Sequence, residues 1–236
     1  MTAVVVPEVS WWWQWVPPAG ASGDEVAAWQ GATAPVFAGW AAGGLAALHG
    51  EHPGVLRDGL TAAAVGDEVA AWLRGRTDGL PDWTRVAWGA GFVVDDRPQW
   101  APVVATVEFR EPSAPDPSYL MDVVATRGRP DDARPPAVDY VTTAAGDGVR
   151  VTALVRGPRR AAFVRVDAAM RLDVPATAAR PARSADVVLS VRVSELGLFA
   201  TVGPGVEELM HVVAAQCLPG ADGVPAIVLP TVRSLP

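Results

Sequence analysis

The chain has 236 residues, half of them apolar, with one cysteine and a formal net charge of −7 at pH 7. This length and composition predict one large domain or two small ones and exclude global disorder. The single cysteine excludes an internal disulfide and a multi-cysteine zinc site. Because neither half of the chain is basic, nucleic acid and anionic membrane surfaces are not expected as partners.

Residue usage is strongly biased, because all 19 basic residues are arginine, Lys and Asn are absent, and the only isoleucine is Ile227. This bias indicates a GC-rich bacterial genome, in which arginine stands where other organisms use lysine. The first basic residue is Arg57, so the positively charged start of a signal peptide is missing. The longest apolar stretch, residues 35–48, is too short to span a bilayer. We therefore expect a cytoplasmic protein.

Four tryptophans crowd five positions near the start of the chain, at Trp11, Trp12, Trp13 and Trp15. Neighbouring side chains of a strand point to opposite faces, so the four rings cannot share one core. Two interpretations remain open. Either the segment crosses between a helical part and a sheet and buries rings on both sides, or the rings contact a protein partner or a second copy of the chain.

The next segments have the apolar spacing of helices. The heptapeptide Gly-Asp-Glu-Val-Ala-Ala-Trp at residues 23–29 recurs at residues 66–72. Ser22 is placed to cap the first copy, whereas the second copy is predicted to lie inside a helix that starts near Thr61. A separate helix is predicted to begin at Pro35. The repeat is either a coincidence of composition or local duplication, or a sign of two related helices that pack together.

From residue 84 the apolar period changes to two, which predicts strands. In chain order we expect a hairpin of strands 86–94 and 103–109 with a turn at 95–98, a short helix at 117–126, a loop at 127–136, strands 138–143 and 149–155 around Gly146-Asp147-Gly148, strands 162–172 and 186–193, and a helix from about Pro204. In strand 162–172 the even-numbered side chains are apolar and predicted to be buried, whereas Arg165, Asp167, Arg171 and Asp173 are predicted to face water.

The predicted fold class is α+β. An antiparallel sheet with packed helices occupies residues 81–217, and a mainly helical, Trp-rich region at residues 1–80 packs on it. Residues 218–236 form an extended, proline-rich tail.

Three stretches from Trp83 onward, at residues 87–92, 136–140 and 206–209, together with the order of the predicted elements, resemble the PsbP-like α/β/α sandwich family. The resemblance covers about two thirds of the chain. It lies in element order and not in a specific motif, so it assigns no functional residue. It implies a binding or accessory role, because such members are mostly non-catalytic.

Motifs that carry chemistry are missing. A P-loop is impossible without lysine, and no GxGxxG, GxSxG, HExxH or CxxC pattern occurs. His49 and His52 have the spacing of two metal ligands on a helix, but Gly50 and Pro53 interrupt any helix there. We therefore predict neither a metal site nor another cofactor.

Two polar groups remain as candidate sites. Arg156, Arg159 and Arg160 surround a strand turn, where they either bind a carboxylate or phosphate or form an exposed hairpin tip. His211 lies four residues after Glu207, which indicates either a pair on the polar face of a helix or part of a polar site.

The sequence therefore favours a non-catalytic protein-interaction, assembly or accessory module whose contacts with a protein partner or a second copy involve Trp11, Trp12, Trp13 and Trp15. The alternative is a small apolar-ligand binding protein, or an enzyme, with a cleft between the Trp-rich helices and the sheet.

Overall fold

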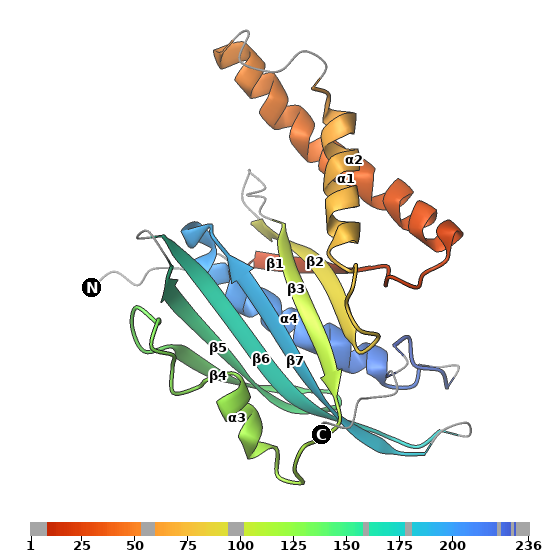
Figure 1. Cartoon of the computed structure of the whole chain (residues 1–236), viewed down its shortest axis with the longest axis vertical. Helices are drawn as coiled ribbons and strands as arrows, with labels where there is room; N and C mark the ends of the chain where they lie inside the picture. The colour runs from red at the N-terminus through yellow and green to blue at the C-terminus, as the bar shows by residue number, and fades with distance from the viewer. Residues whose placement is uncertain are drawn as a thin grey trace. The chain divides into compact units, whose positions relative to one another are not determined.

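The computed structural model describes residues 9–52, 60–93, 102–157, 161–177, 181–220, 223–227 and 229. These residues form an α+β protein with a seven-stranded sheet, which confirms the predicted fold class (Figure 1). The chain divides into two compact units. A sheet unit comprises the residues up to Gln14 and those from Asp82 onward, and a helical unit comprises residues 15–81.

The strands of the sheet lie in the order β1-β2-β3-β7-β6-β5-β4. Their bounds are β1 (Val9–Val16), β2 (Thr84–Val93), β3 (Val103–Arg110), β4 (Ala137–Thr143), β5 (Gly146–Arg156), β6 (Ala162–Val174) and β7 (Arg183–Val193). Every neighbouring pair whose register is described is antiparallel. β1 and β4 stand at the two ends of this order and are the edge strands. The hydrophobic core is centred on the long strands β6 and β7.

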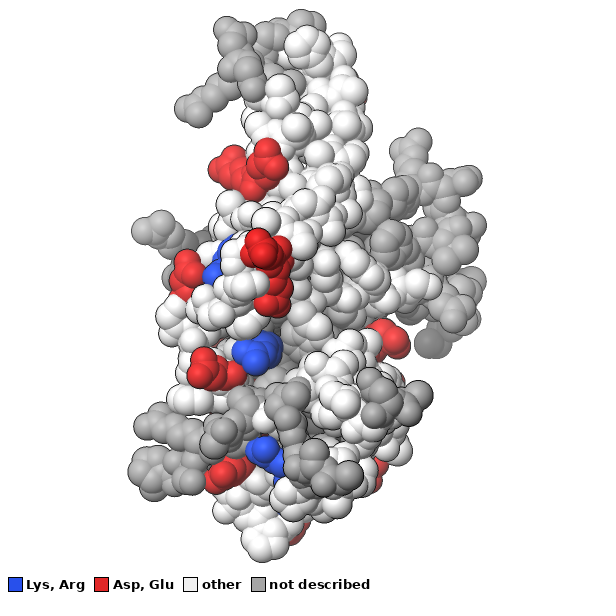
Figure 2. Space-filling view, turned by 90° about the vertical axis from the view of Figure 1, so that its right-hand side faces the viewer, with Lys and Arg blue, Asp and Glu red and all other residues white. Residues whose placement is uncertain are grey.

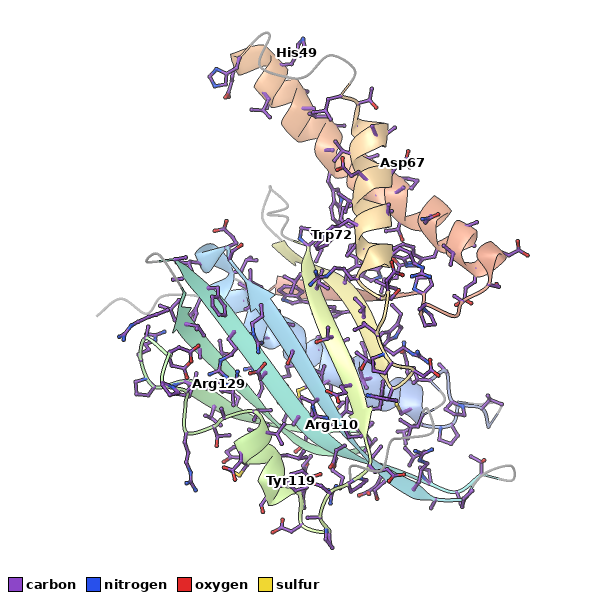
Figure 3. All side chains as sticks on the ribbon, in the orientation of Figure 1. His49, Asp67, Trp72, Arg110, Tyr119 and Arg129 are labelled. Atoms are coloured by element: carbon purple, nitrogen blue, oxygen red, sulfur yellow. The ribbon has the colours of Figure 1, made fainter. Side chains whose placement is uncertain are left out.

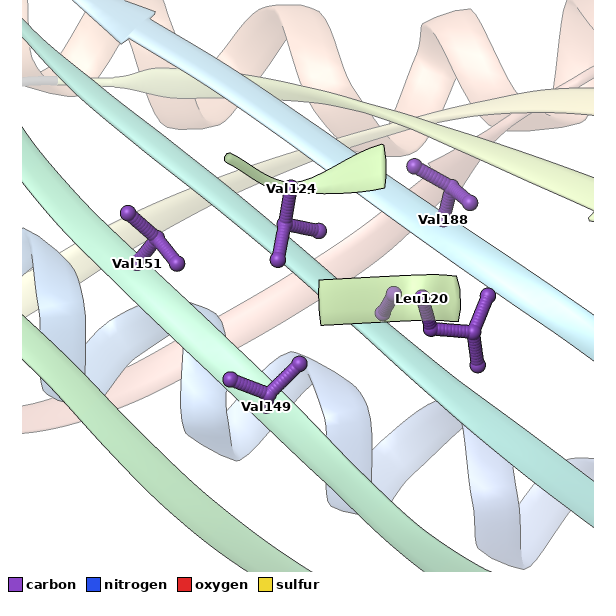
Figure 4. Close-up of a cluster of buried hydrophobic side chains, with 6 residues drawn as sticks. Leu120, Val124, Val149, Val151 and Val188 are labelled. Atoms are coloured by element: carbon purple, nitrogen blue, oxygen red, sulfur yellow. The ribbon is translucent and has the colours of Figure 1, made fainter. Parts of the chain in front are cut away.

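The helices are α1 (Gly23–Glu51), α2 (Ala62–Gly75), α3 (Leu120–Val123) and α4 (Phe199–Cys217), with single 3-10 turns at Pro117–Tyr119 and Leu196–Leu198. α4 packs on one face of the sheet through a stripe with helical spacing, formed by the buried residues Val202, Val206, Leu209, Val213 and Cys217. On the opposite face, Leu120 and Val124 pack against Val149, Val151 and Val188 of β5 and β7 (Figure 4).

β6 confirms half of the predicted burial pattern. Its even-numbered residues from Val164 to Leu172 are fully buried, as predicted. The expectation that the odd-numbered side chains face water is wrong for Arg165 and Asp167, which are buried as well. The reason is tertiary, because the predicted loop folds over this face and brings Arg129 and Asp132 into hydrogen bonds with Asp167 and Arg165.

α1 corrects the prediction of a separate helix from Pro35, because Pro35 lies inside a single helix of 29 residues. The side chains buried on α1 are Trp29, Thr33 and Phe37. Their spacing of four residues places them on one stripe that runs past Pro35, so packing on both sides of the proline outweighs its cost of about 3 kcal/mol in a helix interior. The predicted cap is confirmed, since the Ser22 hydroxyl accepts a hydrogen bond from the Glu25 backbone N–H.

The second copy of the repeat lies inside α2, which begins at Ala62 as predicted, and the Thr61 hydroxyl caps that helix. The two copies differ in their surroundings. α1 and α2 cross so closely that a Cβ on Gly66 would collide with the Ala34 carbonyl and touch Ala38, whereas a Cβ on Gly23 would meet nothing. The repeated letters therefore serve as a helix start in one place and as a helix crossing in the other.

Two boundaries also differ from the predictions. The turn between β4 and β5 is at residues 144–145, because Thr143 pairs with Gly146 and the glycines begin β5. Gly148 is required within that strand, since a Cβ there would lie 2.7 Å from the backbone carbonyl oxygen of Ala169 in β6. α4 begins at Phe199, five residues before Pro204. The predicted turn at 95–98 and most of the predicted tail at 218–236 lie outside the described residues.

Candidate interaction surfaces

The Trp-rich segment forms β1, and strand alternation directs its rings to both faces of the sheet. On the α4 face, Trp11 and Trp13 stack with ring centroids 5.7 Å apart and planes 16° from parallel. Both rings lie against Gly205 of α4. The indole Nε1 of Trp13 donates to the Gly205 carbonyl at 2.9 Å, and a Cβ on Gly205 would collide with the Trp11 ring.

Trp12 lies on the opposite face, where its ring meets the fully buried Trp88 edge-on at a centroid distance of 4.9 Å. Gly89 of β2 makes the close approach of β1 possible, because a Cβ there would lie 2.6 Å from the Trp13 ring. Trp12 is 42 % exposed, whereas Trp11, Trp13 and Trp15 are half-buried. A contact of these rings with a partner stays a prediction.

The helical unit exposes an unusually apolar helix. Between Glu25 and Glu51, α1 has no Asp, Glu or Arg residue over 25 positions. By length and composition it is the one described helix that could cross a membrane, and only 11 % of its most apolar window is buried. α1 therefore differs from the core helix of a soluble protein, which passes the same test but is mostly buried.

A groove of about 580 Å³ runs between α1 and α2, next to their crossing. It is lined by Gln30, Gly31, Ala34, Pro35, Ala38, Ala63, Asp67 and Ala70. Most of the lining side chains are small, and Asp67 supplies the one charge among them. Figure 3 labels Asp67 on α2. Further along α2, Trp72 is 54 % exposed and carries the Arg76 guanidinium over its ring.

The charge of the helical unit is acidic, with six carboxylates against two arginines among its described residues. One of these arginines, Arg74, already donates to Asp78 at 3.2 Å. On the face of the molecule drawn in Figure 2, arginines are few and lie apart, with acidic side chains between them. The surface of the helical unit is therefore apolar with a negative charge.

Sequence reasoning missed a buried ion cluster on the α3 face of the sheet. Asp167 accepts hydrogen bonds from Arg165 at 2.9 Å, from Arg129 at 3.1 Å and from Arg192 at 2.7 Å. Arg165 also reaches both carboxylate oxygens of Asp132, at 2.8 and 2.9 Å. Burial by itself lowers the pKa of Arg165, but the bonds to Asp167 and Asp132 outweigh burial and raise it. The sequence signal for this cluster is the spacing of Arg165 and Asp167, which places two opposite charges on one face of a strand.

Two further arginines hold carboxylates elsewhere in the sheet unit. Arg150 of β5 bridges Asp139 of β4 and Glu207 of α4, both at 2.8 Å. Arg171 of β6 grips the buried Asp186 with two nitrogens. Burial raises the pKa of Asp186 to about 6, against the opposing effect of Arg110.

Of the residues in the two predicted polar groups, the structure describes Arg156 and His211. Arg156 donates to the Ala133 carbonyl at the exposed end of β5, while Arg159 and Arg160 lie outside the described residues. His211 is exposed on α4, and its expected partner Glu207 is bonded to Arg150 instead.

The two histidines considered as metal ligands lie at the end of α1, where His49 is exposed in the last turn and His52 follows the helix. In the described ranges, no three His, Cys, Asp or Glu side chains come together as a metal site. Comparisons with protein-family models, curated proteins and solved structures found no match. The described residues therefore offer two candidate binding surfaces, the Trp-rich strand β1 and the groove between α1 and α2.

Proposed function

We propose that the chain is a non-catalytic protein-interaction module whose helical hairpin, α1 with α2, binds an apolar, positively charged helix of another protein. The observation that carries the proposal is the exposure of α1, a 29-residue helix without a charge over most of its length.

The described residues of the chain leave most of the apolar surface of α1 exposed, which is unfavourable in water. Burying apolar surface contributes roughly 25 cal/mol per Å², so a partner that covers α1 gains substantial free energy. Extended apolar patches on soluble proteins mark interaction sites for the same reason. The groove beside Gly31 and Ala34 offers a place where the side chains of a third helix can insert between the first two.

Charge selects among the possible partners. The hairpin carries an excess of carboxylates, including Asp67 in the groove wall. A second copy would bring these carboxylates together, and an anionic membrane would repel them. A partner helix with Lys or Arg beside its apolar stripe meets both the apolar walls and Asp67, and is the occupant that the surface favours.

The experiment measures peptide binding to the full chain by calorimetry. The probe is an amphipathic leucine–lysine peptide of about 18 residues, or five helical turns, and the control peptide has glutamate in place of lysine. We expect the lysine peptide to bind and the glutamate peptide not to. Its affinity should fall as salt screens the charges.

Two matched variants locate the site. A Cβ meets nothing at Gly31, which lines the groove, or at Gly39, which is on the same helix but not in the groove lining. Gly31→Leu fills the groove and should weaken peptide binding by about tenfold or more, or 1.4 kcal/mol. Gly39→Leu makes the same change in helix propensity and should leave the affinity within about twofold.

Equal binding of both peptides, or equal effects of the two leucine substitutions, would contradict the proposal. The groove volume also lies in the range of small-molecule sites, which keeps a ligand-binding protein as the second candidate. That function predicts the opposite pattern, in which a small apolar amine raises the melting temperature of the chain and neither peptide binds.

A further inference from the structure

β1 is an edge strand that carries neither charge nor proline, two features that often protect an edge. It is the first strand in the sheet order, and no described strand pairs with its outer side. Its eight residues, Val9–Val16, contain no charge and no proline. Ser10 and Trp12 are exposed. Uncharged edge strands with aromatic side chains are templates for pairing with another strand.

The opposite edge of the same sheet has a different character. β4 contains the charged Asp139, which forms an ion pair with Arg150 at 2.8 Å, and two prolines at 135–136 precede the strand. Charges and prolines of this kind discourage edge-to-edge pairing. The two edges of the sheet therefore differ in the charges and prolines that discourage pairing.

We propose that β1 pairs with β1 of a second copy of this chain, which joins two sheets across a two-fold axis. A two-fold contact sets the same strand against itself, so a charge on β1 would face a like charge. β1 has none, and this is the property that self-pairing requires. Antiparallel pairing would also place Trp side chains of the two copies across from one another, and aromatic cross-strand pairs stabilise sheets.

The contact has two components. The outward backbone groups of β1 exchange hydrogen bonds with the second copy, as in any antiparallel ladder. The exposed part of Trp12 is covered on one face, while Trp11 and Trp13 remain held on Gly205 on the other. The residues of this surface up to Gln14 belong to the sheet unit, whereas the groove between α1 and α2 belongs to the helical unit.

The experiment is sedimentation velocity of the full chain over a range of concentrations, with Trp12→Lys and Tyr140→Lys as matched variants. Both replace an exposed aromatic on an edge strand, and Tyr140 on β4 is 73 % exposed. We expect the wild type and Tyr140→Lys to form dimers with the same dissociation constant. Trp12→Lys should raise that constant by at least about tenfold, because lysine on an edge opposes pairing. Circular dichroism verifies that each variant is folded.

Hydrogen exchange of the wild type tests the same contact without a substitution. Amides of residues 10–13 should exchange more slowly as the chain concentration rises into the dimer range, while those of β4 should not change. A wild-type chain that stays monomeric at high concentration overturns the proposal. So does a dimer that Tyr140→Lys dissociates and Trp12→Lys does not, or one in which residues 10–13 gain no protection.

Discussion

Replacing Arg165 tests the buried ion cluster most directly. The side chain is 2 % exposed and donates three hydrogen bonds of 2.8–2.9 Å, one to Asp167 and two to Asp132. In Arg165→Met, Asp167 keeps its bonds to Arg129 and Arg192. Asp132 keeps only the backbone N–H of Arg129, at 2.7 Å, and is left as a buried carboxylate without a cation. Removing one partner of a buried ion pair costs about 3–5 kcal/mol.

Arg192→Met is the matched control. Its side chain is 41 % exposed and binds the same Asp167, which would keep two other arginines. Loss of a solvent-screened pair of this kind costs about 1 kcal/mol or less. The free energy of unfolding of both variants is measured by urea titration followed by tryptophan fluorescence. In addition, Asp132→Ala should recover part of the loss when combined with Arg165→Met, because the orphaned carboxylate is then gone.

The reasoning fails if Arg165→Met is no more destabilising than Arg192→Met. The alternating sequence pattern alone predicts that Arg165→Asp lowers the free energy of unfolding much less than Val166→Asp does. That result would also contradict the structure. The structure predicts similar losses for these two aspartates, since both positions are buried. The aspartate at 165 would also face Asp132 and Asp167.

Three further predictions concern glycine, cysteine and pH. Gly205→Ala and Gly89→Ala should each lower the free energy of unfolding by about 1–3 kcal/mol in urea titrations, because the new Cβ atoms overlap the Trp11 ring and the Trp13 ring, respectively. Gly39→Ala, where a Cβ meets nothing, should not destabilise the chain. Cys217 is 1 % exposed, and burial raises the pKa of its thiol to about 12. An aromatic disulfide reagent at pH 8 should therefore label Cys217 only as fast as the protein opens. Rapid labelling of the folded chain would contradict this burial. Burial raises the pKa of Asp186 from 3.8 to about 6, so the folded chain binds an extra proton between these values. This group should therefore lower the free energy of unfolding as pH rises from 4 to 6. Asp186→Asn should flatten that slope, and an unchanged slope would show that another group causes it.

Local patterns in the sequence were enough to predict most elements of the sheet unit. A period of two from residue 84 predicted the first hairpin, and the even-numbered residues of β6 are buried as that period requires. The caps at Ser22 and Thr61 were also predictable, because each involves a hydroxyl and a backbone N–H only three residues away. Local rules failed at Pro35, where packing of residues on both sides keeps the helix continuous.

The placement of the four tryptophans was predictable only in part. Alternation along a strand requires neighbouring rings to point to opposite faces, and Trp12 does face away from Trp11 and Trp13. The sequence could not indicate what the rings meet. Trp11 and Trp13 rest on Gly205, which is nearly 200 residues away in the chain, and no local pattern joins these positions.

By itself, the sequence determined the α+β class, the faces to which strand side chains point and the helix cap at Ser22, because each depends on composition or on residues a few positions apart. Only the tertiary structure decided what covers each face. Alternation directs Arg165 and Asp167 to the side of β6 opposite Val166, but whether that side meets water depends on where residues 127–136 fold. Burial and pairing are properties of distant segments brought together, and for that reason the ion cluster, the glycine contacts of the tryptophans and the groove between α1 and α2 emerged only from the folded chain.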